Sequence, residues 1–194
     1  MPRSARRLER LRSVLERRQP GLTVVIENVH DPHNVSAILR SCDAVGVARV
    51  ELLYTVERFP RIGKKSSSSA NKWVECRRHT SVAACFETLR GEGFQILATR
   101  LGSVTRPLYA CALAQPTAFV VGNEHRGVSE EAAAGADACI SIPMMGMIES
   151  LNVSVAAAVC LYEALRQRSA AGMYSTPQFP PDLLESLFSE WRVR

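Results

Sequence analysis

The sequence predicts an α/β fold, in which a parallel β-sheet carries helices on both of its faces. Short apolar segments typical of strands alternate with segments that have helical periodicity along most of the chain. The strand-like segments are almost continuously apolar, which is expected where a sheet is covered on both sides. With 194 residues, 46% hydrophobic and 22% charged, the chain has the size and composition of one globular domain with short appendages.

The first expected element is an arginine-rich helix. Leu8, Leu11, Val14 and Leu15 recur at helical spacing among the arginines, so the helix has one apolar stripe and a broad cationic face. Residues 1–19 contain seven arginines and two glutamates, a net charge of +5, which equals the charge of the whole chain. The excess charge therefore belongs to an appendage and suggests a polyanionic partner such as nucleic acid. A solvated helix that only packs on the body is the alternative.

The body then alternates between strands and helices. The expected strands are residues 23–27, 50–54, 95–99, 118–121 and 139–142. The expected helices are residues 34–45, 81–90, 129–134 and 152–168. Residues 60–72 predict a long polar loop, because they contain a glycine and four consecutive serines.

The end of the chain predicts one more short helix. Pro177, Pro180 and Pro181 mark a linker, and Asp182 is the expected helix cap. The apolar face of this helix comprises Leu183, Leu184, Leu187, Phe188 and Trp191. We therefore expect a basic helical extension at residues 1–20, a main domain at residues 21–172 and a C-terminal helical extension at residues 173–194.

Several classes of function lose support from the sequence. The six cysteines are scattered without a C-x-x-C pair, and the spacing of His30, Asp31 and His33 matches no established zinc pattern, so no metal site is expected. The first strand is not followed by G-x-G-x-x-G, and neither a phosphate-binding Walker loop nor a G-x-S-x-G nucleophile motif is present. The longest apolar stretch, residues 153–161, is too short to span a membrane, and no secretory signal is visible, so a cytoplasmic protein is expected.

Three segments at the expected strand ends could carry chemistry, because ligands of α/β proteins bind there. The first is N-V-S-A-I-L-R, from Asn34 to Arg40, at the start of a helix whose free N–H groups suit a phosphate. The second is G-N-E-H-R-G after an apolar strand, in which the glycines allow a tight turn and Glu124 could bind a ligand or hold a helix terminus. The third runs from residue 140 to residue 154 through a methionine-rich loop, and reaches a helix by way of Ser150 and Asn152.

Together, and in this order, these segments resemble the three signature motifs of the SpoU/TrmH family of RNA 2'-O-methyltransferases, within the SPOUT superfamily. The third segment, which continues to Y-E-A at residues 162–164, is the most specific of the three. A small departure is Ser36, where the family often has glycine. The resemblance covers nearly the whole chain, and both terminal extensions resemble those of the members that methylate guanosine 18 in the D-loop of tRNA.

The resemblance implies a C-terminal trefoil knot in the parallel sheet, a homodimer, a tRNA partner, no metal, and S-adenosylmethionine as the methyl donor. It implies that the knot loops bind the donor in a bent shape and that the Ala-rich helix after Asn152 contributes to the dimer. By motif position, the expected donor contacts are Thr99, Leu101, Gly122, Asn123, Glu124, His125, Arg126, Ile142, Met147 and Leu151.

The resemblance also assigns the catalytic residues: Arg40, Asn34, Glu124, Ser150 and Asn152. Arg40 would accept the proton of the ribose hydroxyl, although a guanidinium is normally protonated, so an orienting role remains the alternative. The expected RNA contacts are Arg7, Arg10, Arg18, His33, Arg166 and Arg168.

Two other classes of function remain open. The first is the same chemistry on another tRNA or rRNA ribose. The second is a non-catalytic RNA-binding protein, which would not need the motif asparagine, arginine and glutamate.

Overall fold

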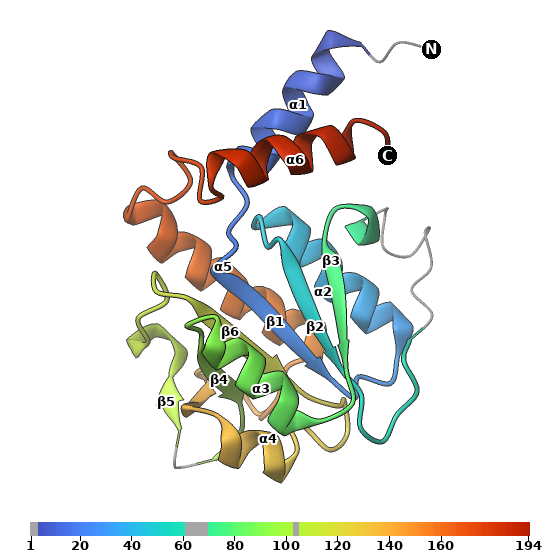
Figure 1. The fold of residues 1–194 in the computed structure, drawn as a ribbon. Helices are drawn as coiled ribbons and strands as arrows, with labels where there is room; N and C mark the ends of the chain where they lie inside the picture. The colour runs from blue at the N-terminus through green and yellow to red at the C-terminus, as the bar shows by residue number, and fades with distance from the viewer. Residues whose placement is uncertain (1–3, 61–69, 103–104) are drawn as a thin grey trace.

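The computed structural model describes residues 4–60, 70–102 and 105–194, and it has the predicted α/β architecture. A seven-stranded parallel sheet has the order β3-β2-β1-β6-β4-β7-β5 (Figure 1). The strands are β1 (Leu22–Glu27), β2 (Arg49–Leu53), β3 (Glu75–His79), β4 (Gln95–Thr99), β5 (Arg106–Pro107), β6 (Thr117–Val121) and β7 (Ala138–Ser141).

Helices cover both faces of the sheet. The α-helices are α1 (Ala5–Glu16), α2 (Pro32–Ala44), α3 (Val82–Gly91), α4 (Glu130–Gly135), α5 (Val153–Ala170) and α6 (Pro181–Trp191), and the short 3₁₀ helices are η1 (Ala70–Lys72) and η2 (Leu108–Ala110). None of the helices in the described residues is both long and apolar enough to cross a membrane.

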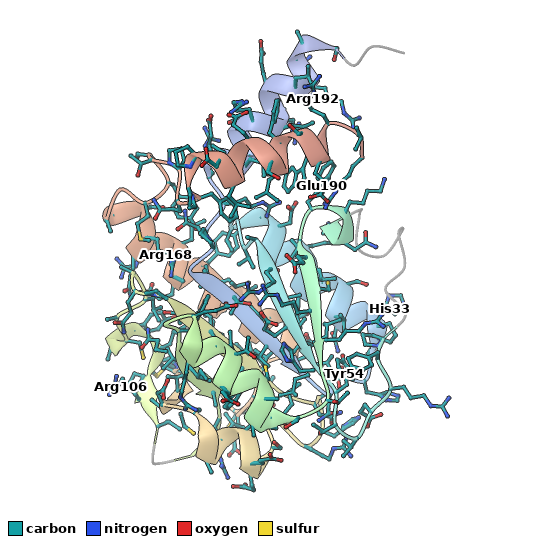
Figure 2. The ribbon with its side chains drawn as sticks, in the orientation of Figure 1. His33, Tyr54, Arg106, Arg168, Glu190 and Arg192 are labelled. Carbon is teal, nitrogen blue, oxygen red and sulfur yellow. The ribbon has the colours of Figure 1, made fainter. Side chains whose placement is uncertain are left out.

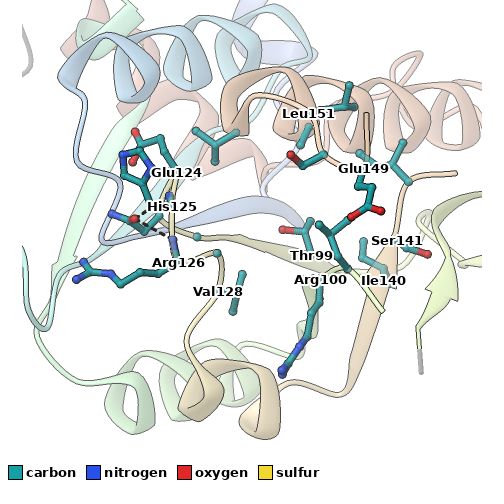
Figure 3. A pocket seen from close by; sticks show the side chains of 18 of the residues that line it. Thr99, Arg100, Glu124, His125, Arg126, Val128, Ile140, Ser141, Glu149 and Leu151 are labelled. Carbon is teal, nitrogen blue, oxygen red and sulfur yellow. Dashed lines mark hydrogen bonds between the residues drawn. The ribbon is translucent and has the colours of Figure 1, made fainter. Parts of the chain in front are cut away.

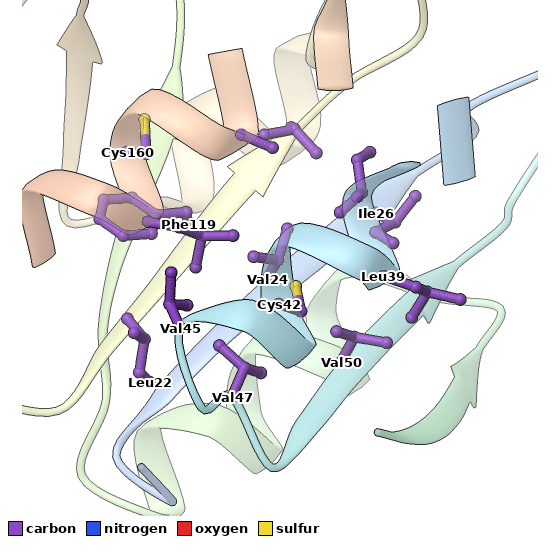
Figure 4. Close-up of a cluster of buried hydrophobic side chains, with 14 of the residues drawn as sticks. Leu22, Val24, Ile26, Leu39, Cys42, Val45, Val47, Val50, Phe119 and Cys160 are labelled. Carbon is purple, nitrogen blue, oxygen red and sulfur yellow. The ribbon is translucent and has the colours of Figure 1, made fainter. Parts of the chain in front are cut away.

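Alternation along β1 divides the core between the two faces. Val24 and Ile26 pack with α2 and α5 in the larger cluster of buried side chains (Figure 4). Val25, between them, packs on the other face with α3 and α4. Because β1 is buried at all six positions, its side chains fix both helical layers to the sheet.

The terminal helices form a third cluster. Leu11 and Leu15 of α1 pack against Leu184 and Trp191 of α6, so the two ends of the chain lie together at one end of the molecule (Figure 1). The apolar stripe predicted on α1 is therefore confirmed, and its partner is the C-terminal helix.

Three helix boundaries follow the capping residues of the sequence. Ser129 accepts a hydrogen bond from the N–H of Ala132 and begins α4, and Asn152 accepts one from the N–H of Ser154 and begins α5, as predicted. Helix α2 begins earlier than expected, at Pro32, because Asp31 caps it by accepting from the N–H of His33.

Three expectations need correction. Asp182 does not cap α6: Pro180 is the N-cap, and Asp182 lies in the first turn. Strand β3 was not predicted, since the sequence E-C-R-R-H has no apolar alternation, and an edge strand does not need one. The predicted loop at residues 60–72 ends in η1, and its residues 61–69 lie outside the described part of the chain.

Candidate active site

A pocket of about 410 Å³ lies at the carboxyl ends of β4, β6 and β7. In Figure 3, Glu124, His125 and Arg126 stand on one side of it, and Thr99 and Glu149 on the opposite side. The lining comprises residues 99–101, 122–128, 140–142 and 149–151, with Glu130, Met144, Val153 and Ala156. The second and third motifs therefore form most of the wall, at the sheet edge where α/β proteins bind ligands.

The loop after β6 is held by two close backbone contacts. Asn123 and Gly127 exchange N–H···O bonds of 3.0 and 2.8 Å, which close the loop on itself. A Cβ atom on Gly122 would lie 2.1 Å from the carbonyl carbon of Gly127, so only glycine is compatible with this approach. Gly127 has a φ of +68°, which also favours glycine. Both glycines of the motif are thus explained by the shape of the loop.

Glu124 attaches this loop to the start of α2. Its Oε1 accepts from Asn34 Nδ2 at 2.9 Å and from the N–H of Asp31 at 3.1 Å, and its Oε2 accepts from the N–H of His30 at 3.0 Å. Burial raises the pKa of Glu124, but these hydrogen bonds outweigh burial, and the pKa is lowered overall. The sequence left two roles open for Glu124, binding a ligand or holding a helix terminus, and the structure shows the second.

Asn34 continues the hydrogen-bonded chain to the third motif. Its Oδ1 accepts from Asn152 Nδ2 at 3.1 Å, and the Oδ1 of Asn152 accepts from the N–H and the hydroxyl of Ser154 at 2.8 and 2.6 Å. The three motifs are therefore joined in space by Glu124, Asn34 and Asn152. Ser150, two residues before Asn152 in the sequence, lines the pocket.

The structure places the remaining predicted residues as follows. All the residues expected to contact the methyl donor, except Met147, line the pocket. The side chain of Met147 is fully exposed and lies outside the lining, so its contact with the methyl donor stays a prediction. Arg40 is exposed on α2, does not line the pocket, and has no carboxylate within ion-pair distance among the described residues. His33 is exposed in the first turn of α2.

Comparison with known proteins assigns the family. Residues 21–162 match the model of the SpoU rRNA Methylase family. The chain belongs to this family of methyltransferases. It is 47% identical to a tRNA (guanosine(18)-2'-O)-methyltransferase of Thermus thermophilus over 97% of both chains. It is 46% identical to the Escherichia coli protein of the same name over 87% of this chain and 73% of that one.

Solved structures agree with this assignment. The crystal structure of the Aquifex aeolicus TrmH/SpoU tRNA modifying enzyme has a TM-score of 0.91 and 40% sequence identity, covering 97% of this chain and 95% of that chain. The SpoU methyltransferase AviRb of Streptomyces viridochromogenes, in complex with the cofactor AdoMet, has a TM-score of 0.69 and 25% identity over 80% of this chain and 59% of that chain. The family predicted from the motifs, and the parallel α/β sheet predicted from the alternation of strand-like and helical segments, are thereby confirmed.

Sequence reasoning missed Asn28, which organises a second loop of this SpoU-family site. Asn28 has a φ of +49°, and its Oδ1 accepts from the N–H groups of residues 55, 56 and 57 at 3.0–3.2 Å. Its carbonyl accepts from Asn123 Nδ2 at 2.9 Å. The loop thus fixed presents Glu57, whose pKa is lowered by hydrogen bonds from His30 and from Arg126 of the pocket. The feature that marks Asn28 is its positive φ, which is visible in the structure and not in the sequence.

Two of the expected RNA contacts are buried. Arg18 and Arg168 are each 1% exposed. Arg18 donates to the carbonyl of Val47 and to Asp43, and its guanidinium lies 5.3 Å from the ring of Trp191. The guanidinium of Arg168 donates to backbone carbonyls and to a glutamine side chain. These positions do not allow either side chain to contact RNA directly, so both assignments are corrected to structural roles.

The other predicted RNA contacts remain at the surface. Arg7 and Arg10 are exposed on α1, and no carboxylate of the described residues pairs with them. Arg166 is exposed and paired with Glu163 at 2.8 Å. Not every arginine of the basic extension is free, since Arg12 is held by Glu185 at 2.6 Å.

Proposed function

We propose that this chain transfers a methyl group from S-adenosylmethionine to the ribose 2'-hydroxyl of guanosine 18 in the tRNA D-loop. The observation that carries the proposal is the 47% identity, over 97% of both chains, with a relative named for this reaction. The meeting of the three motifs around one pocket gives that identity a structural basis.

The pocket suits the proposed donor. Its volume of about 410 Å³ lies within the usual range for small-molecule sites. Leu101, Ile142 and Leu151 offer apolar surface, and the closed loop from Gly122 to Gly127 presents backbone groups at close range. S-adenosylmethionine supplies an electrophilic methyl group on a positively charged sulfur, and a carboxylate such as Glu149 on the wall favours that charge. A family neighbour solved with AdoMet supports the choice.

The substrate side of the reaction is assigned to the motif residues. The ribose hydroxyl must lose its proton as it attacks the methyl group. We assign Arg40 one of two roles. It either orients the hydroxyl and accepts the proton, or it orients the hydroxyl together with a phosphate while another group accepts the proton. Asn34, Ser150 and Asn152 position the substrate and the loops. Arg40 has no ion-pair partner among the described residues, so its positive charge is available to orient the hydroxyl or a phosphate, whereas accepting the proton requires that the guanidinium first loses its own.

A homodimer completes the proposal. Exposed apolar side chains, which an isolated domain seldom gathers, occur around the third motif and on α5: Met145, Met147, Ile148, Val155 and Tyr162. Arg40 lies outside the pocket of its own chain, and in the proposed dimer the second copy brings an Arg40 to each pocket. The trefoil knot, the cytoplasmic location and the division at residues 20 and 172 remain parts of the same proposal.

Site mapping tests the reaction. The purified protein is incubated with S-adenosylmethionine and an unmodified tRNA transcript, and the methylated ribose is located by its resistance to alkaline cleavage. We expect one resistant position, guanosine 18. When that nucleotide is 2'-deoxyguanosine, which is itself resistant to alkali, we expect no transfer of labelled methyl groups to the RNA. Methylation at another tRNA position or of rRNA alone would replace this substrate with the alternative one, and no methylation of any RNA would overturn the proposal.

Mixing two inactive variants tests the dimer. Arg40→Ala keeps the pocket, whereas Leu101→Arg fills the pocket and keeps Arg40. If Arg40 acts on the partner's pocket, mixed dimers regain one working site, and activity returns to roughly a quarter of the wild-type level. No recovery after verified subunit exchange would show that each chain uses its own Arg40, and failure to detect any subunit exchange or dimer would overturn the homodimer.

A further inference from the structure

The two faces of the sheet differ in how their arginines are neutralised. Around α3 and α4, four arginines bind carboxylates: Arg49 with Glu51, Arg77 with Glu92, Arg90 with Asp137, and Arg100 with Glu130. These guanidinium groups are already paired, so that side of the molecule offers little free positive charge.

The opposite face carries unpaired cations at its outer edge. Arg58, Arg78 and Lys72 are exposed, and none has a carboxylate within 4.0 Å among residues 4–60, 70–102 and 105–194. We call these three residues the outer-edge strip. Arg78 lies opposite Leu52 in the parallel pairing of β3 with β2, and Leu52 packs in the core beneath α2. Arg78 therefore stands on the α2 face of the sheet.

Arg78 is held in place by an aromatic stack. Its guanidinium lies 5.1 Å from the ring centre of Phe59, and that ring lies 5.2 Å from the ring of Tyr54. Tyr54 is fixed in turn by a 2.9 Å hydrogen bond from its hydroxyl to the carbonyl of Val29. A guanidinium seated on a ring keeps its N–H edge free, and it loses less side-chain entropy when an anion binds.

The strip runs between the pocket and the terminal helices. At one end, Arg58 follows Glu57, which binds Arg126 of the pocket wall. At the other end, Arg194 donates to the carbonyl of Lys72, and Trp73 lies 4.8 Å from Trp191 of α6. Strand β3 spans the distance between these ends. The strip thus continues the positive charge of α1 along the sheet edge toward the pocket.

We propose that the outer-edge strip binds the phosphate backbone of the RNA substrate between α1 and the pocket. This inference rests on the proposed function, which supplies an RNA as the substrate. A planar guanidinium in a fixed position matches a phosphate in a bidentate geometry, and a row of separate cations matches the regular charge of a nucleic-acid strand better than one bound anion. RNA held along this line would reach both α1 and the reacting centre.

A salt series on the full-length protein tests the strip. The variant Arg58→Gln/Arg78→Gln removes two cations. Arg106→Gln is the control, since Arg106 is also exposed and has no carboxylate within 4.0 Å in the described part of the chain, but lies at the opposite edge, on β5 (Figure 2). Each phosphate contact contributes about 0.9 in duplex or about 0.7 in single-stranded RNA to the slope of log affinity against log salt. We expect the double variant to lower the slope for a tRNA transcript by about one to two, and the control to leave it unchanged.

Two further variants separate charge from packing. Arg78→Lys keeps the charge, so it should retain most of the slope of log tRNA affinity against log salt. Phe59→Leu removes the ring beneath Arg78 and should weaken tRNA binding, with unchanged affinity for S-adenosylmethionine. An unaltered slope in the double variant, or an equal loss of affinity for a polyglutamate probe, would overturn the proposal. Methylation mapped away from guanosine 18 in the wild-type protein would count against the proposed function alone, because the slope is measured independently of the reaction.

Discussion

Replacing Arg168 with methionine tests whether this arginine supports the fold instead of contacting RNA. The side chain lies in the interior, between α5 and the segment that enters β1 (Figure 2). Its Nε donates to the carbonyl of Leu113 at 3.0 Å, its Nη1 to Gln19 Oε1 at 3.3 Å, and its Nη2 to the carbonyls of Gly21 and Gln115 at 2.7 and 2.8 Å. No carboxylate of the described residues pairs with it, and burial lowers its pKa.

The magnitude follows from those four acceptors. Methionine fills a similar volume but donates no hydrogen bond, so four oxygens lose their partner. The loss costs about 1–3 kcal/mol for each of the two buried oxygens and less for the part-buried carbonyls of Gly21 and Gln115. Relief of the buried charge offsets part of this, so we expect a net loss of about 3–5 kcal/mol, which is less than the sum over four fully buried acceptors. For a chain of this size each kcal/mol lowers Tm by about 2–4 °C, so Tm should fall by roughly 6–20 °C.

Thermal unfolding and a tRNA salt series decide the case. Arg168→Met should unfold at a lower temperature than the wild type. Well below its Tm, its tRNA affinity should depend on salt as in the wild type, since no phosphate contact is lost. Arg166→Met is the control: its guanidinium is exposed, and its Tm should barely change. If Arg168→Met kept its Tm but its tRNA affinity depended less steeply on salt, the structural role would be refuted.

The remaining predictions concern the basic helix and the loop anchor. Arg7→Gln/Arg10→Gln should lower the tRNA salt slope by about one to two with unchanged Tm, because both side chains are exposed and unpaired. Glu124→Gln should weaken S-adenosylmethionine binding at least about tenfold by calorimetry, since an amide nitrogen cannot accept from the N–H groups that the carboxylate holds. The pKa of Glu124 is lowered, so its contribution is present above the ordinary value of 4.5 and is lost as pH falls through the lower folded value. Donor affinity that declined already between about pH 7 and pH 5 would contradict this assignment.

The sequence predicted the elements whose signals are local. Ser129 and Asn152 mark helix starts because a side chain caps its own neighbouring N–H groups. Strand β1 is buried throughout and has a central run of apolar residues, Val24, Val25 and Ile26, so its pattern is clear. Strand β3 gives no such pattern, because as an edge strand it needs neither two buried faces nor apolar alternation. Asp182 was misassigned because Pro181, with its fixed φ, is the first residue of α6, so the N-cap lies two residues before Asp182, at Pro180.

The roles of the arginines could not be predicted in the same way. Arg7 and Arg18 have similar neighbours in sequence, yet one is exposed and the other is 1% exposed. The acceptors that bury Arg18 and Arg168 are largely backbone carbonyls from distant segments, and every residue carries a carbonyl, so no residue type in the sequence identifies them. Pairing with carboxylates depends equally on which strands and helices become neighbours. A count of arginines therefore predicts an affinity for polyanions, but the packing of the fold determines which of those cations remain free to meet a phosphate.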